Sequence, residues 1–164
     1  MQRHLRALAA ATFLLGGGPL AQAYDARATI ADLDGRLAKI GAARLQGTDV
    51  VAGKTVPAIY FGERKINNNY DVVDAVRKAH NATATVFVKD GEEFVRVSTN
   101  VLTPEGKRGI GTQLARNAAY AAVSQGQVFC GAVDVLGTAF DACYHPIKDA
   151  LGKVIGVSYI GHKK

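Results

Sequence analysis

Apolar residues recur with a helical period near the start of the chain. Four of them follow one another at intervals of three and four among charged neighbours: Ile30, Leu33, Leu37 and Ile40. This spacing places them in one stripe on an amphipathic helix. The pattern predicts a long first helix over about residues 25–45 that ends before Gly47.

The next part of the chain predicts a short strand and a second helix. Residues 55–61 indicate a strand, which Pro57 restricts to a sheet edge or a strand start. The asparagines at 67–69 favour a turn. Asn69 is a suitable N-cap for a short helix that follows, with valines on its buried side at 72, 73 and 76.

From Ala82 onward the apolar period changes to two, which is typical of strands. The predicted strands cover residues 83–88, 93–99, 128–135, 139–145 and 154–160. A glycine-rich loop over 100–112 and an alanine-rich helix over 117–124 interrupt them. Consecutive hairpins favour an antiparallel sheet with helices packed against it, which is an α+β fold.

The first residues have the features of a secretory signal peptide. Arg3 and Arg6 precede an apolar stretch over 7–15, a break at Pro19 and an A-x-A sequence at 21–23. We expect cleavage after residue 23, leaving one domain over 24–164 in the periplasm or outside the cell. The alternative is an uncleaved anchor, but the apolar stretch is far shorter than the roughly 20 residues that cross a bilayer. The mature chain is therefore not expected to insert into a membrane.

Composition supports a single soluble domain. The 164 residues are 48% hydrophobic and 21% charged, with neither low-complexity repeats nor heptads. The net charge is +6, but the basic residues are scattered singly, and the predicted leader contains two of the arginines. Nucleic acid is therefore not an expected partner.

Two segments of the chain partly resemble enzyme motifs, and neither meets the requirements of its motif. Residues 47–55 have five residues between their glycines, where a phosphate-binding loop needs four, and residues 156–160 lie inside a predicted strand rather than at a nucleophile elbow. The histidines have no metal-ligand spacing. The sequence therefore predicts no catalytic residue, no metal and no cofactor, and we expect a protein that is not an enzyme.

The two cysteines lie on consecutive predicted strands. If the turn consists of residues 136 and 137, Cys130 and Cys143 face each other and can form a disulfide. If the turn is shifted by one residue, the two sulfurs lie diagonally and too far apart. An oxidising compartment favours the bond; the alternative is two buried thiols.

Arg96 is the first candidate for contact with a ligand. Strand alternation predicts that Phe94, Arg96 and Ser98 share one face. A guanidinium beside a hydroxyl suits a carboxylate. Alternatively, Arg96 lies in solvent or pairs with Glu92 or Asp90.

Further candidates supply polar groups and aromatic walls for a small pocket. They are Thr99, Asn100, Thr112, Tyr120, Phe140 and Tyr144. For the two tyrosines, ordinary core packing is the alternative.

Several short segments, in the same order along the chain, resemble those of a known family. They are residues 55–62, 65–69, 83–88, 94–100, 111–112, 134–137, 144–147 and 152–156. Over residues 25–162 the chain resembles single Cache domains of the Cache 3/Cache 2 fusion type. The resemblance implies a PAS-like extracytoplasmic sensor fold, in which a long N-terminal helix lies behind a central antiparallel sheet and short helices and loops cover a ligand pocket on the other face. It also implies a carboxylate held by an arginine with a following serine.

The resemblance predicts a function in signal transduction, such as chemotaxis. Such domains usually lie between two membrane helices of chemoreceptors or sensor kinases, whereas this chain ends at Lys164, where the second would begin. We expect a secreted, stand-alone module that binds a small molecule and presents it to a membrane receptor or kinase. The alternatives are a small enzyme that combines Arg96 with His145, and a structural domain. His162 departs from the aromatic residue expected there.

Overall fold

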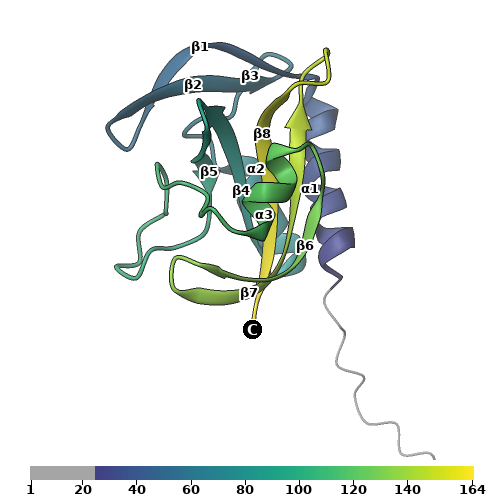
Figure 1. Cartoon of the computed structure of the whole chain (residues 1–164), viewed down its shortest axis with the longest axis vertical. Coiled ribbons are helices and arrows are strands. Elements are labelled where there is room, and N and C mark those ends of the chain that lie inside the picture. Colours follow the sequence, from purple (N-terminus) through teal and green to yellow (C-terminus); the bar gives the residue numbers. More distant parts are fainter. Residues whose placement is uncertain (1–24) are drawn as a thin grey trace, which may run out of the picture.

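The computed structural model describes residues 25–164 (Figure 1). The helices are α1 (Ala26–Ile40), α2 (Asp71–His80) and α3 (Ala118–Ser124). The strands are β1 (Ala43–Val51), β2 (Lys54–Phe61), β3 (Arg64–Lys65), β4 (Thr83–Asp90), β5 (Glu93–Thr99), β6 (Phe129–Val135), β7 (Thr138–Lys148) and β8 (Val154–Lys163). An antiparallel sheet has the order β5-β4-β8-β7-β6, and a small sheet has the order β1-β2-β3. The predicted α+β class is confirmed.

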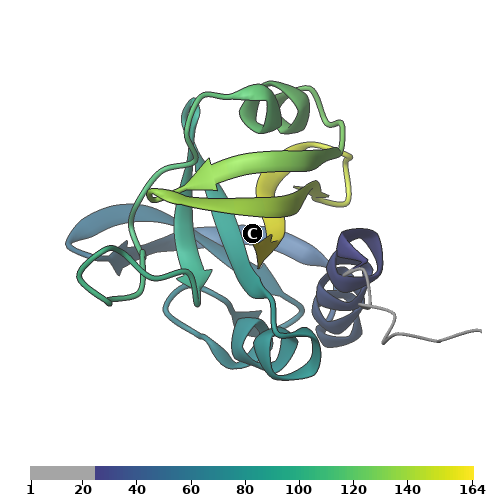
Figure 2. The same ribbon diagram turned by 90° about the horizontal axis from the view of Figure 1, so that it is seen from below.

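The five-stranded sheet separates two apolar cores. On the first side, which we call the helical face, α1 and α2 pack on the sheet through Ile30, Leu33, Leu37 and valines of α2 and β4. On the other side, α3 and the connection 100–117 cover large aromatic residues. We call this side the aromatic face; its rings are Phe87, Phe94, Tyr144 and Tyr159. Figure 2 shows α2 (teal) and α3 (green) on opposite sides of the sheet.

The first helix begins as predicted and ends earlier than predicted. The Asp25 carboxylate accepts hydrogen bonds from two backbone amides of the first turn, at 3.0 and 3.2 Å. The helix stops at Ile40 because Gly41 has φ 152° and lies against Gly62, where a Cβ would be 2.4 Å from the Gly62 Cα. The expectation of a helix to residue 45 is therefore wrong, and the chain enters β1 instead.

The small sheet explains the position of Pro57. At Pro57, β2 pairs only with β1, because β3 pairs with Tyr60 and Phe61 alone. The proline therefore has the edge-like position predicted for it. The prediction for Asn69 needs a correction: Tyr70 is the N-cap of α2, and the Asn69 side chain accepts from the Asp71 amide at 3.1 Å.

The β6–β7 hairpin joins the two cysteines. Val135 pairs with Thr138, so the turn consists of Leu136 and Gly137, both with positive φ. This register places Cys130 opposite Cys143, with 4.1 Å between the Cα atoms, and the two form a disulfide. The predicted bond is confirmed. The other predicted strands and helices after residue 82 are also present, and β7 and β8 run three residues further than expected.

Candidate ligand-binding site

Arg96 lies on the aromatic face beneath the connection between β5 and α3. Its side chain is 3% exposed, and its guanidinium carbon lies 4.8 Å from the centre of the Phe87 ring. Nη1 donates to Thr112 Oγ1 at 2.9 Å and to the Gln113 carbonyl at 3.2 Å. The expectations that Arg96 lies in solvent or pairs with Glu92 or Asp90 do not hold. The prediction that Thr112 lies close to Arg96 agrees with these contacts.

The connection also bonds to the backbone of Arg96. The Arg96 amide donates to the Thr112 carbonyl at 2.8 Å, and the Gly111 amide donates to the Arg96 carbonyl at 2.8 Å. Thr112 Oγ1 in turn donates to the Gly109 carbonyl at 2.5 Å. Residues 109–113 therefore behave like a short extra strand at the edge of β5, which fixes the position of the Arg96 side chain.

One edge of the guanidinium is free. Nε is buried without a hydrogen-bond partner, and Nη2 has no acceptor among residues 25–164. No ion pair of Arg96 with an acidic side chain exists in this part of the chain. Burial lowers the pKa of Arg96, and the neighbouring Tyr144 and Tyr159 act in the opposite sense. Arginine nevertheless keeps its charge in proteins, so this charge is buried without an anion.

Two tyrosines of the aromatic face act electrostatically on Arg96. The ring centres of Tyr144 and Tyr159 are 4.8 Å apart, and the Tyr159 hydroxyl lies 3.1 Å from Thr83 Oγ1. Burial raises the pKa of Tyr159 to about 12 and moves the pKa of Tyr144 upward as well. Both phenols therefore stay protonated at neutral pH. The Tyr159 hydroxyl donates to Thr83 Oγ1, because the Thr83 hydroxyl itself donates to the Gly161 carbonyl, and the Tyr144 phenol can donate a hydrogen bond. Tyr144 belongs to the core as well as to the candidate site.

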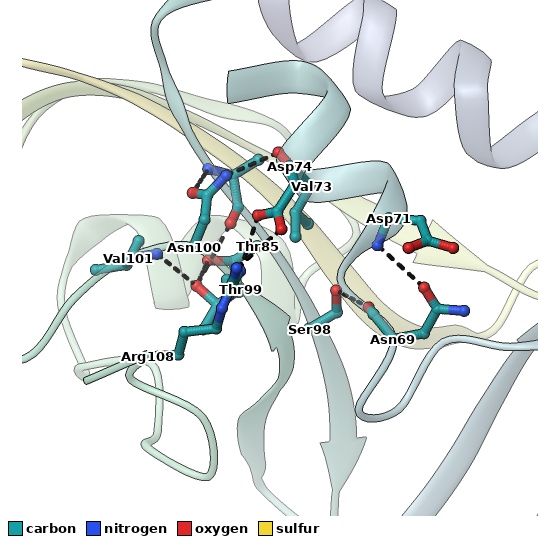
Figure 3. Close-up of polar contacts among 11 residues, drawn as sticks. Asn69, Asp71, Val73, Asp74, Thr85, Ser98, Thr99, Asn100, Val101 and Arg108 are labelled. Carbon is teal, nitrogen blue, oxygen red and sulfur yellow. Dashed lines mark hydrogen bonds and ion pairs between the residues drawn. The ribbon is translucent and has the colours of Figure 1, made fainter. Parts of the chain in front are cut away.

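Ser98 does not share the face of Arg96. Phe87 pairs with Arg96 and Val86 pairs with Ser98, so Val97 is an extra residue, a β-bulge in β5. The bulge reverses the alternation, and Ser98 Oγ donates to the Asn69 carbonyl at 2.5 Å on the helical face (Figure 3). The predicted pairing of Arg96 with Ser98 is wrong for this reason.

Thr99 and Asn100 make structural contacts at the end of β5. Thr99 Oγ1 lies 2.6 Å from Thr85 Oγ1, and the Asn100 side chain accepts from the Ala84 amide and donates to the Val73 carbonyl, each at 2.7 Å (Figure 3). Their polar atoms thus join β5 to β4 and α2, rather than extending the Arg96 site.

Arg108 is an important residue that the sequence did not indicate. It makes two hydrogen bonds of 2.8 Å to Asp74 and donates to the Thr99 carbonyl at 2.9 Å (Figure 3). Its guanidinium also lies over the Tyr70 ring. This pair attaches the connection 100–117 to α2. A sequence signal for it is absent, because Arg108 follows Lys107 in a polar loop and its partner lies 34 residues away.

The remaining candidates, Tyr120 and Phe140, lie elsewhere on the aromatic face. Tyr120 of α3 packs edge-on against Phe94, and its hydroxyl donates to the Glu92 carbonyl at 2.6 Å, so its polar atom is engaged between β4 and β5. Phe140 is buried and lines a separate cavity of about 370 Å³ at the end of the sheet, together with Asn100. Of the predicted residues, Thr112 therefore contacts Arg96 directly, and Tyr144 belongs to the core on the same face of the sheet.

His145 does not join Arg96 in a catalytic arrangement. His145 Nδ1 lies 2.7 Å from one oxygen of Asp34 on α1, and Ser158 Oγ donates to the other at 2.5 Å. This cluster is on the helical face, and Arg96 is on the aromatic face. His162 likewise contacts α1, with Nε2 3.2 Å from Thr29 Oγ1. Within residues 25–164, no three histidine, cysteine or acidic side chains are grouped to hold a metal.

Comparison with protein families gives one decisive match. A model of the Cache 3/Cache 2 fusion domain matches residues 7–164. This chain belongs to that family. Cache domains are extracytoplasmic sensor and ligand-binding domains and are typically non-catalytic, and the disulfide of this Cache domain is consistent with such a location. No curated protein matches the chain.

The match begins inside the segment predicted to be a leader. Residues 1–23, the predicted signal peptide, lie outside the residues that the structure describes. Among the described helices, none has both the length and the apolar character needed to cross a bilayer.

Proposed function

We propose that this Cache domain binds a small carboxylate on the free edge of Arg96 and acts as a periplasmic or secreted ligand-binding module. The observation that supports this most is the buried guanidinium whose Nε and Nη2 have no partner. A charge in such a place lowers stability unless an anion compensates it. A bound carboxylate provides that anion.

The free edge has the shape that a carboxylate requires. Nε–H and Nη2–H are parallel, so they can donate to the two oxygens of one carboxylate in a bidentate arrangement. Thr112 and Gln113 hold the opposite edge, and the Phe87 ring holds the plane of the guanidinium. The group is therefore oriented before the ligand arrives, which reduces the entropy lost on binding.

The surroundings favour a ligand with an apolar or aromatic body. The Phe87 ring lies against the guanidinium, Tyr144 and Tyr159 belong to the same apolar core, and the protonated Tyr144 phenol can donate to a further acceptor of the ligand. Because residues 109–113 bond to both the backbone and the side chain of Arg96, binding is expected to slow amide hydrogen exchange in this segment.

The experiment is a thermal-shift screen of the purified domain with acetate, propionate, succinate, malate and amino acids as probes. A carboxylate that binds raises the melting temperature of the wild type. Arg96→Met is expected to weaken that ligand by about ten- to a hundredfold. The matched control is Arg116→Met, since Arg116 is an exposed arginine that pairs with Glu93. Equal affinity of the Arg96 variant and the wild type would contradict the proposal.

The cellular part of the proposal is secretion followed by presentation of the ligand to a membrane receptor or kinase. The predicted leader supports export. N-terminal sequencing of the exported protein is expected to begin at Tyr24, or within a residue or two of it. An exported form that retains Met1 would contradict cleavage.

A further inference from the structure

A cavity lies at the end of the sheet beside the C-terminus, the end that faces the viewer in Figure 2. It is about 370 Å³ in volume, where β4 begins and where β5 and β8 end. Its apolar wall includes Val101, Val135 and Phe140. This volume is near the lower end of the range of ligand pockets, so a compact ligand fits it. Neither Arg96 nor its neighbours Thr112 and Tyr144 line it.

The charged side chains that line this cavity are both positive. Arg77 from α2 and Lys163 from β8 line it, and no acidic residue does. Among residues 25–164, neither cation has an ion-pair partner. The side chains of Asn81 and Thr138, which also line the cavity, make no hydrogen bond within the described part of the chain.

Two acidic side chains that neighbour these cations on α2 and in the β7–β8 pair are engaged elsewhere. Asp74, one turn before Arg77 on α2, makes both its hydrogen bonds with Arg108, at 2.8 Å each. Asp141, which is close to Lys163 in the β7–β8 pair, contacts Lys164 Nζ at 3.3 Å. The two cations at the cavity are therefore available to an anion from outside the chain.

We propose that this cavity is a binding site for a small amphipathic anion. A carboxylate or phosphate head lies between Arg77 and Lys163, with Asn81 and Thr138 as further hydrogen-bond partners, and the apolar body of the ligand packs against Val101, Val135 and Phe140. The site goes beyond the proposed function, because it shares no side chain with the Arg96 edge and can be occupied independently of it.

The test uses isothermal titration calorimetry of the purified domain with phenylacetate and hexyl phosphate as probes. The uncharged analogue phenylacetamide measures the contribution of the acidic head. The double variant Arg77→Gln/Lys163→Gln removes both cations. Its matched control is Lys78→Gln/Lys107→Gln, which removes the same charge from two exposed positions, and neither of these lysines lines the cavity.

At least one anionic probe is expected to bind the wild type, and the amide about tenfold more weakly or not at all. The Arg77/Lys163 variant is expected to lose about tenfold or more in affinity, and the control no more than about twofold. Equal losses in both double variants would show only a general charge effect and would overturn the proposal. The proposal would also be overturned if neither phenylacetate nor hexyl phosphate bound the wild type at concentrations up to about 10 mM.

Arg96→Met separates the two sites. If phenylacetate binds in the cavity at the end of the sheet (the end cavity), we expect the Arg96 variant to bind it as tightly as the wild type does. If Arg96→Met abolishes binding and the Arg77/Lys163 variant retains it, the probe occupies the Arg96 edge and the end-cavity proposal is wrong. If Arg96→Met leaves every carboxylate unaffected while the end-cavity variant loses its probe, the proposed function fails and this inference stands.

Discussion

Arg96→Met separates a ligand-binding role of the arginine from a structural one. Methionine keeps an unbranched stem of similar length, so most of the packing under the 109–113 segment is retained. The substitution removes the buried charge, the hydrogen bonds to Thr112 and Gln113, and the contact with the Phe87 ring. The free energy of unfolding without ligand then depends on which of these effects is larger.

The opposing contributions are similar in size. Burying an ion without a counter-ion costs several kcal/mol, here roughly 4 kcal/mol. Two hydrogen bonds from a charged donor contribute roughly 3 kcal/mol, and the cation–π contact contributes about 1 kcal/mol. We therefore expect the free energy of unfolding of the unliganded variant to lie within about 1 kcal/mol of the wild-type value. An arginine with a purely structural role would predict a clear loss.

The assay is urea denaturation of both proteins with and without the carboxylate that the screen identifies. At a ligand concentration of about 100 times the wild-type Kd, the wild type is expected to gain about 2.7 kcal/mol. The variant, whose Kd is ten- to a hundredfold higher, is expected to gain only about 0.4–1.4 kcal/mol. A loss of more than about 3 kcal/mol in the unliganded variant would refute the reasoning, since it would mean that the charge itself holds the fold together.

Three further predictions follow from the same contacts. Replacing Cys130 and Cys143 by alanine is expected to lower the free energy of unfolding by about 2–3 kcal/mol in urea, and a reductant should have no additional effect on that variant. Burial lowers the pKa of His162 below its ordinary 6.5, so the native state binds this proton less readily than the unfolded chain does. Stability is therefore expected to fall as the pH drops below about 6.5, and His162→Gln, compared with wild type by denaturation at several pH values, should weaken that dependence. Ser98→Ala is expected to cost about 1 kcal/mol in stability but to leave carboxylate affinity unchanged, because Ser98 faces α2; a tenfold loss of affinity would contradict this orientation.

The elements that the sequence predicts well are those whose side chains alternate between core and solvent or between two cores. The stripe on α1 and the period of two in the later strands follow directly from burial. The register of the β6–β7 hairpin also follows from local chemistry, since Gly137 supplies the positive φ of a two-residue turn. The disulfide could be predicted once that turn was assigned.

The elements that the sequence does not reveal are exposed or depend on distant residues. β1 is mostly exposed, so burial imposes no periodic pattern on it, and its pairing with β2 depends on backbone hydrogen bonds. The end of α1 is set by Gly41 against Gly62, a contact between distant parts of the chain. No local pattern contains this information.

The candidate site illustrates this limit most directly. Strand alternation assigns Arg96 and Ser98 to one face, and that argument fails because Val97 adds one residue to β5 opposite an unbroken β4. The same bulge sends the serine toward α2 while the arginine stays beneath the 109–113 segment. The sequence also does not show that Arg96 lacks an acidic partner, because Asp90 and Glu92 are close enough along the chain to form an ion pair with it. Only the folded arrangement leaves this guanidinium without them, and the proposal of a carboxylate ligand rests on that unbalanced charge.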